Sequence, residues 1–420
     1  MNETAQSAPS AGDHSWRWRK ARELGAVVCL CFVIWILRRP HQLLHPYVWV
    51  EESQILREYI HHGWLGAIKF APAGYLIMPV NLLLPFSAWI SFIHLPALLY
   101  VFATAVFAAT ILLIVLPDSD FGDSHTMFAM AVALALCPVN PEVYGVFLYS
   151  FWWVTLWPLI ILGWKRDLWW WRVPLLAIAA LSSPAAGALF VLYAVSYLVN
   201  RRRRDLVSCA ILLCGFILES SLLLTSTRAS ALHSTATPRA LAEQSLRTGG
   251  FFVSWWFTTP IFDRVFVGAV GFALFGWLGL VATRGIRQGS WDQPFLYMAL
   301  VMFVIFAAVP APLLSNPQSA GPRYYFLPFV GIFWCLIQII GRGYKPHIRL
   351  AWPLLIAGSL GLPATFSRTA ETTVAKLSWR AEIQKCERAA APINVPIYFD
   401  GSNTFWALTM TPAECRRYLR

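Results

Sequence analysis

Two adjacent carboxylates, Glu51 and Glu52, follow the first apolar run of the chain. Neighbouring like charges resist joint ionisation, so one of the pair would hold its proton more tightly than an isolated glutamate. Such a carboxylate is suited to general acid–base chemistry. The alternative is an amphipathic surface helix over residues 52–68 whose N-terminus the two acids stabilise. The side chains expected to face lipid in that helix are Ile55, Leu56, Tyr59, Ile60 and Trp64.

A third acid and one arginine could complete such a site. Glu142 lies in a proline-flanked loop between two very apolar runs, where ionisable groups are uncommon. Arg323 is the only base in residues 319–328, and Tyr324 follows it. A guanidinium can hold a phosphate as a fork, with a tyrosine hydroxyl as a further donor. The alternatives are a solvated loop glutamate and an arginine that snorkels to a membrane interface.

A very hydrophobic chain must position these residues. Of its 420 residues, 58% are hydrophobic and only 13% are charged, whereas about 25% are charged in a soluble protein. We therefore predict an all-α polytopic membrane protein. The net charge of +12 is attributed to membrane topology rather than to nucleic-acid binding. No GxxxxGK[ST], HExxH, CxxC or GxSxG motif occurs, so P-loop ATPase, zinc-protease, zinc-ribbon and hydrolase functions lose their sequence support.

About eleven transmembrane helices are expected within residues 22–364. They are placed near 22–38, 92–116, 126–139, 150–164, 173–182, 185–200, 206–225, 264–283, 294–312, 325–341 and 350–364. The pair 173–182 and 185–200 could instead be one helix that Pro184 kinks. Residues 74–89 are apolar, but Pro79 and Pro85 interrupt them, so we expect an interfacial or re-entrant helix there.

The proposed inside loops are denser in Lys and Arg than the outside loops, which predicts a cytoplasmic N-terminus. Residues 1–21 are expected to be disordered. The predicted outside loops are 38–91, 140–149, 226–263 and 313–324, and the tail, 365–420, leaves the last span on the same side.

The tail has soluble composition and is predicted to form a small α+β domain. Residues 379–390 and the segment that begins at Thr411-Pro412 indicate helices, and residues 395–399 a strand. Cys386 and Cys415 are the only cysteines outside apolar runs. Because thiols oxidise outside the cytoplasm, we predict a disulfide between them. Two unrelated thiols are the alternative, and a Cα separation beyond about 7 Å would exclude the bond.

The order of these motifs resembles the GT-C superfamily of integral-membrane glycosyltransferases, and within it a bacterial family of glucosyltransferase-like membrane proteins. The resemblance covers residues 35–330. The motifs that carry it are Arg38-Arg39-Pro40, Trp49-Val-Glu51-Glu52-Ser53, Gly74-Tyr75-Leu76, Pro141-Glu142 with Trp152-Trp153, and Arg323-Tyr324-Tyr325 with Pro328. Two positions depart from the family pattern. Glu52-Ser53 replaces a common Asp-Gly, and Asn81 stands where an arginine is expected.

The resemblance implies a GT-C-like transmembrane domain in a bacterial inner membrane, with the active site and the tail on the periplasmic side. The reaction would transfer a sugar from a polyprenyl-phosphate donor to a glycan or glycolipid acceptor. Glu51, Glu52 and Glu142 are the expected catalytic residues, with Glu51 preferred as base. The donor phosphate would contact Arg323, Tyr324 and Arg57, and the substrate Tyr75 and Trp152.

Direct displacement by a hydroxyl with one carboxylate base would invert the anomeric centre. No cofactor is expected, and a divalent metal is possible but not favoured, since neither adjacent carboxylate has further oxygen ligands nearby in sequence. Two other functions stay open: a transporter or flippase of lipid-linked glycan, and a non-catalytic membrane assembly protein. A transporter would need ionisable residues inside its spans, and Glu219 is almost alone there.

Overall fold

The computed structural model describes residues 11–115, 121–139, 141–165, 168–226, 238–254, 263–287, 322–343, 345–367, 378–397 and 406–418. The helices of the first half are α1 (Ala11–Arg38), α2 (Pro40–Leu44), α3 (Val50–Lys69), α4 (Met78–Ile90), α5 (Leu95–Val115), α6 (Ser124–Ala135), α7 (Ser150–Thr155), α8 (Trp157–Leu162), α9 (Trp169–Ala180), α10 (Pro184–Ala188) and α11 (Phe190–Asn200). The second half contains α12 (Arg203–Thr225), α14 (Pro238–Ser254), α15 (Asp263–Arg287), α17 (Phe326–Gly341), α18 (Ile348–Ser359), α19 (Leu362–Ser367), α20 (Trp379–Arg388) and α21 (Pro412–Tyr418). Three short 3₁₀ helices, η1 (Pro141–Val143), η2 (Phe147–Tyr149) and η3 (Pro322–Tyr325), and two strands, β1 (Ile393–Ile397) and β2 (Trp406–Met410), complete the described elements.

Four of the described helices are long and apolar enough to cross a membrane. They are Leu95–Val115, Arg203–Thr225, Phe266–Arg284 and Arg323–Gly341. Most other expected spans coincide with shorter apolar helices, among them Ser124–Ala135, Phe147–Leu162, Pro184–Asn200 and Ile348–Ser359. The expected span 294–312 lies outside the described residues. The described chain is thus an all-α protein of membrane character with one small sheet.

Two predicted domain boundaries differ from the helix bounds. Within the segment 1–21, which is expected to be disordered, α1 begins at Ala11, and residues 1–10 lie outside the described part of the chain. The boundary between the membrane domain and the tail was placed at 364/365, and it falls inside α19.

Pro184 and Pro79 each lie in the first turn of a helix. α9 ends at Ala180 and α10 begins at Pro184, with the Ser183 hydroxyl accepting from the Ala185 amide at 3.2 Å. Residues 173–200 are therefore separate helices rather than one kinked helix. α4 has Pro79 in its first turn and spans 13 residues, fewer than the roughly 20 of a full span. The interfacial or re-entrant position expected for it stays a prediction.

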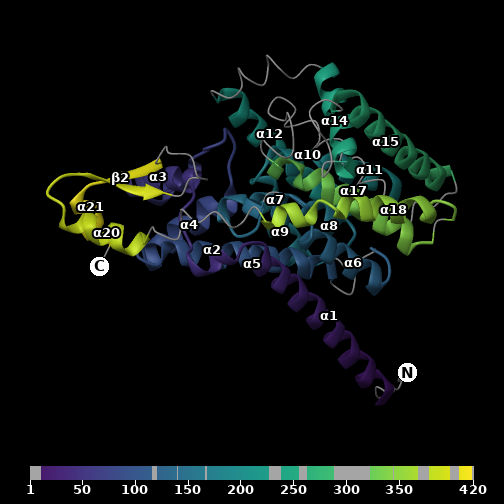
Figure 1. Cartoon of the computed structure of the whole chain (residues 1–420), viewed down its shortest axis with the longest axis horizontal. Helices are drawn as coiled ribbons and strands as arrows, with labels where there is room; N and C mark the ends of the chain where they lie inside the picture. Colours follow the sequence, from purple (N-terminus) through teal and green to yellow (C-terminus); the bar gives the residue numbers. More distant parts are fainter. Residues whose placement is uncertain are drawn as a thin grey trace, which may run out of the picture.

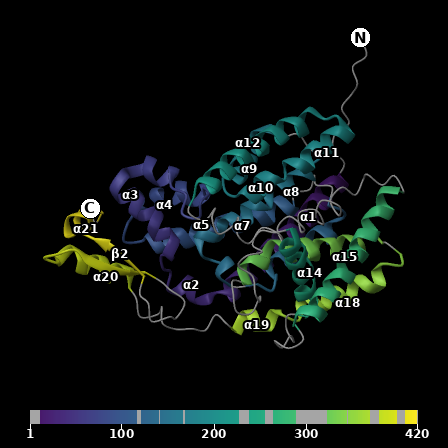
Figure 2. The same ribbon diagram turned by 90° about the horizontal axis from the view of Figure 1, so that it is seen from above.

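The core of the bundle is aromatic and joins helices distant in sequence. Trp35 of α1 stacks on Phe107 of α5 with ring centroids 4.4 Å apart, and Trp153 of α7 lies 4.8 Å from Phe326 of α17. Figure 2 shows α9, α11 and α12 on one side of this centre and α14, α15 and α18 on the other. In the most apolar 18-residue windows of the four long helices, 83% of the residues are buried within 323–341 and only 22% within 203–225. α17 is therefore central and α12 peripheral.

α3 does not present its apolar face to lipid as expected. Ile55, Leu56, Tyr59 and Ile60 are all buried within the protein, and only Trp64 remains substantially exposed. The helix is interrupted at Gly63, whose φ of 68° is accessible to glycine without a steric penalty. The amphipathic pattern was read correctly, but protein rather than lipid covers its apolar side.

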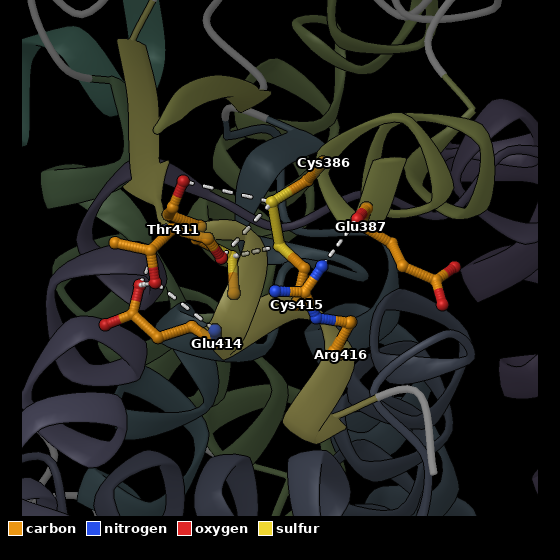
Figure 3. Close-up of a disulfide and its surroundings, with 7 residues drawn as sticks. Cys386, Glu387, Thr411, Glu414, Cys415 and Arg416 are labelled. Carbon is orange, nitrogen blue, oxygen red and sulfur yellow. Dashed lines mark hydrogen bonds between the residues drawn. A yellow bond between two sulfur atoms is a disulfide. The ribbon is translucent and has the colours of Figure 1, made fainter. Parts of the chain in front are cut away.

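The tail forms the predicted small α+β unit, with one strand that was not expected. β1 and β2 pair antiparallel, with Ile393 opposite Met410. Cys386 on α20 and Cys415 on α21 form the predicted disulfide, with their Cα atoms 6.1 Å apart (Figure 3). The unit lies against α3 at one end of the molecule (Figures 1 and 2). Tyr418 stacks there on Phe92 at 5.0 Å.

Candidate active site

A small cavity brings together residues from four distant segments. Its wall includes Glu51 from α3, Tyr75 from the segment before α4, Tyr149 and Trp152 from η2 and α7, and Arg323 and Tyr324 from η3. All of these except Tyr149 were expected in the site from the sequence. The cavity volume is about 90 Å³. At about 30 Å³ per water molecule, this is room for reacting groups rather than for a whole sugar.

Glu51 occupies the first turn of α3 and lines the cavity. Its Oε2 atom is buried and has no hydrogen-bond partner among the described residues. A buried carboxylate oxygen without a partner costs free energy, so native proteins seldom keep one without a reason. An acceptor of this kind is available to a ligand hydroxyl.

Glu52 does not line the cavity. It is 1% exposed, and its two oxygens accept from the amides of Trp49 and Leu148, each at 2.7 Å. The first of these bonds belongs to a capping box that starts α3. Burial raises the pKa of Glu52 to about 7, although both hydrogen bonds oppose that shift. The expected catalytic role is therefore not supported, since both oxygens already hold the main chain.

Arg323 is fixed between an acid and two aromatic rings. Its Nη1 donates to Oε2 of Glu142 at 2.8 Å. The guanidinium carbon lies 5.3 Å from the ring centre of Tyr149 and 5.4 Å from that of Tyr324, within cation–π range. Glu142 is 7% exposed and does not line the cavity. Its position supports orientation of Arg323 rather than proton transfer.

Arg57 does not join the site. It is exposed on α3 and absent from the cavity wall. Six residues separate it from Glu51, which turns its side chain about 240° around the helix axis. Arg57 therefore does not contribute to this cavity, and the expected contact with the donor phosphate is not supported.

Two further polar atoms of the cavity wall resemble Glu51 Oε2 in lacking a hydrogen-bond partner among the described residues. The Tyr149 hydroxyl and the Trp152 indole N–H are buried and have no hydrogen-bond partner in the described part of the chain. One offers a donor and an acceptor, and the other a donor only. Tyr149 was missed in the sequence. The only available signal was its place seven residues after Glu142 in a loop rich in aromatic residues.

The segment that carries Tyr75 is held from both sides. The Leu76 amide donates to Oε2 of Glu219 at 2.9 Å, across 143 residues of sequence. Asn81 Nδ2 donates to the carbonyl of Phe70 at 2.7 Å. Asn81, which stands where an arginine was expected, thus supports the main chain beside the cavity and does not line it.

The chemistry of this wall is that of a binding site for a polar organic group. It combines one unpaired carboxylate oxygen, hydroxyl and indole donors, and a guanidinium with only Nη1 hydrogen-bonded among the described residues. In the described ranges no group of three His, Cys, Asp or Glu side chains is arranged to hold a metal ion. No protein-family model, curated protein or solved structure matches this chain.

Proposed function

We propose that the protein is a GT-C-like membrane glycosyltransferase that uses a polyprenyl-phosphate sugar. The acceptor would be a glycan or glycolipid of the cell envelope. The observation that carries the proposal is that one cavity is lined both by Glu51, with one buried and unpartnered carboxylate oxygen among the described residues, and by Arg323. These are the two groups that displacement at a sugar phosphate needs.

The chemistry assigns one task to each group. An acceptor hydroxyl is a poor nucleophile, so Glu51 takes its proton as the new bond to the sugar C1 forms. The bond between C1 and the phosphate oxygen breaks, and its electron pair leaves with the phosphate. Arg323 and Tyr324 stabilise the charge that develops on that oxygen. One displacement step with one base inverts the anomeric centre.

The proposal also specifies the membrane topology and the location of the protein. About eleven spans, a cytoplasmic N-terminus and a periplasmic cavity and tail in a bacterial inner membrane follow from the loop charges and the motif order. The cavity is too small for the whole donor. In the proposed complex only the anomeric centre, its phosphate oxygen and the attacking hydroxyl occupy it, while the polyprenyl chain stays in lipid.

The test is envelope-glycan analysis of a deletion strain complemented with Glu51→Gln. We expect loss of the glycan modification by about 10²–10⁴-fold in rate, the usual contribution of a general base. The matched control is Glu58→Gln, a residue seven positions further along the same helix that pairs with His62 at the surface. Normal glycan from well-expressed Glu51→Gln protein would contradict the proposal.

A further inference from the structure

A second, larger cleft lies between α3, the end of α4 and the tail helix α21. Its volume is about 560 Å³, within the usual range for organic ligands. Trp64, Trp89 and Tyr418 line it, together with His61 and Arg417. We propose that this cleft binds the saccharide chain of the acceptor, an inference that rests on the proposed function.

The aromatic rings of the cleft are exposed where a sugar could stack on them. Trp89 is 68% exposed and Trp64 39%, although both are large apolar side chains. Behind them, Tyr59 packs against Trp64 at 5.9 Å and against Tyr418 at 6.0 Å. Rigid rings supply a large contact area at small conformational cost. The cleft therefore presents flat apolar ring faces that need little rearrangement to contact a ligand.

The polar groups of the cleft favour sugar hydroxyls over an anionic lipid headgroup. Arg417 is exposed and lies 5.7 Å from the ring centre of Tyr418. His61 is half exposed, and its Nδ1 lies 3.8 Å from a carboxylate oxygen of Glu414. The Glu414 carboxylate beside His61 lowers the local positive charge and repels phosphate. Mixed donors and acceptors around aromatic rings suit a neutral polyhydroxyl chain.

Both sides of the cleft are firmly held. α21 is tied to α20 by the disulfide, and Trp379 of α20 donates its indole N–H to the Phe92 carbonyl at 2.8 Å. The opposite side belongs to α3, whose first turn carries Glu51. At 1.5 Å per residue, Tyr59 lies about 12 Å along this helix from Glu51. A short oligosaccharide held in the cleft could thus extend to the cavity.

The experiment measures binding of envelope oligosaccharides to the full-length protein in nanodiscs. The probe is the fluorescently labelled oligosaccharide pool that mild acid releases from the envelope of the producing bacterium. Trp89→Ala, and Trp89→Ala with Trp64→Ala, are compared with the wild type. The matched control is Trp170→Ala, a 91% exposed tryptophan on α9 that does not line the cleft. We expect about tenfold weaker binding for Trp89→Ala and wild-type binding for the control.

The outcomes separate this inference from the proposed function. Glu51→Gln should bind the oligosaccharides normally while transfer is lost. Equal binding by the wild type and both cleft variants, or no binding by the wild type, overturns the cleft proposal and leaves the role of Glu51 intact. Binding of anionic phosphatidylglycerol vesicles that is lost in Arg417→Ala, without oligosaccharide binding, would replace the saccharide with a lipid headgroup and overturn it as well.

Discussion

The cavity wall and the tail differ in how far their polar groups are hydrogen-bonded. In the tail, Thr411 and Glu414 form a reciprocal cap at the start of α21, with the Thr411 amide 2.7 Å from Glu414 Oε2 and the Glu414 amide 3.2 Å from Thr411 Oγ1 (Figure 3). In the cavity wall, buried polar atoms of Glu51, Tyr149 and Trp152 lack partners among the described residues.

The difference indicates which region is built for stability and which for binding. A satisfied cap and a disulfide lower the free energy of the fold and offer nothing to a ligand. Unpaired buried groups cost stability, and a ligand, an ion or an ordered water supplies the missing bond where such groups are retained. Changes in the tail should therefore act on stability, and changes in the cavity wall mainly on activity, except where a residue also balances a buried charge.

Arg323 is that exception, and it should show the largest effect on stability. Arg323→Ala removes the ion pair with the buried Glu142, which costs about 3–5 kcal/mol. Arg323→Lys keeps the charge but loses the fork, so it should unfold at a temperature closer to the wild type and retain more transfer activity. Thermal unfolding in detergent and a glycan assay measure the two effects. Equal loss of activity in both variants would indicate that Arg323 only orients its neighbours.

The disulfide should be the largest stabilising contribution in the tail. Removing it with Cys386→Ala and Cys415→Ala opens a loop that spans 29 residues of sequence separation, at an expected cost of about 3.5 kcal/mol. Hydrogen exchange of tail peptides in the full-length protein measures the loss. Cys214→Ala, which removes an exposed free cysteine of α12, is the control. Unchanged tail protection would show that packing on α3 alone holds this unit.

Glu52 should give the protein a pH-dependent stability without a direct role in transfer. Its pKa is about 7 in the folded chain against an ordinary value of 4.5, so the folded state binds the proton more tightly. Stability is then greatest below about pH 4.5, falls as the pH rises to 7, and changes by at most about 3 kcal/mol. Unfolding curves across this range should be flatter for Glu52→Gln. An identical slope in both proteins would contradict the assignment.

The cap of α21 should show the smallest effect. Thr411→Ala removes the hydroxyl that accepts from the Glu414 amide, at a cost of about 1 kcal/mol. Hydrogen exchange of α21 should increase while transfer activity stays unchanged. Thr409→Ala, which breaks only a surface hydrogen bond to Asn394, is the control. Loss of activity in Thr411→Ala alone would indicate that α21 contributes to the reaction directly.

The sequence predicted elements whose signal is local. The apolar helices α5 and α12, of 21 and 23 residues, reach the length needed to cross a membrane, and the Thr411-Pro412 helix start has its own capping chemistry. The cysteine pairing followed because only two thiols lie outside apolar runs. The membrane character of the chain and the architecture of the tail were therefore accessible.

The sequence could not decide features that depend on distant partners. Glu51 and Glu52 are neighbours of the same type, and only the Leu148 amide, 96 residues away, identifies Glu52 as a structural acid. Amphipathic periodicity in α3 does not reveal whether lipid or protein covers the apolar face. β2 was not predicted because a five-residue strand is stabilised by its pairing with β1, which the local sequence does not reveal. These outcomes reflect tertiary contacts that override local pattern.

The bond between Glu219 and the Leu76 amide ties a long apolar helix to the wall of the cavity. Glu219 lies on α12, the least enclosed of the four long apolar helices, and Leu76 directly follows Tyr75 of the cavity wall. A hydrogen bond of 2.9 Å tolerates only small changes in length before it weakens. Any displacement of α12 must therefore move the Tyr75 segment with it or break the bond. The position of this helix and the geometry of the cavity are thus coupled through one hydrogen bond.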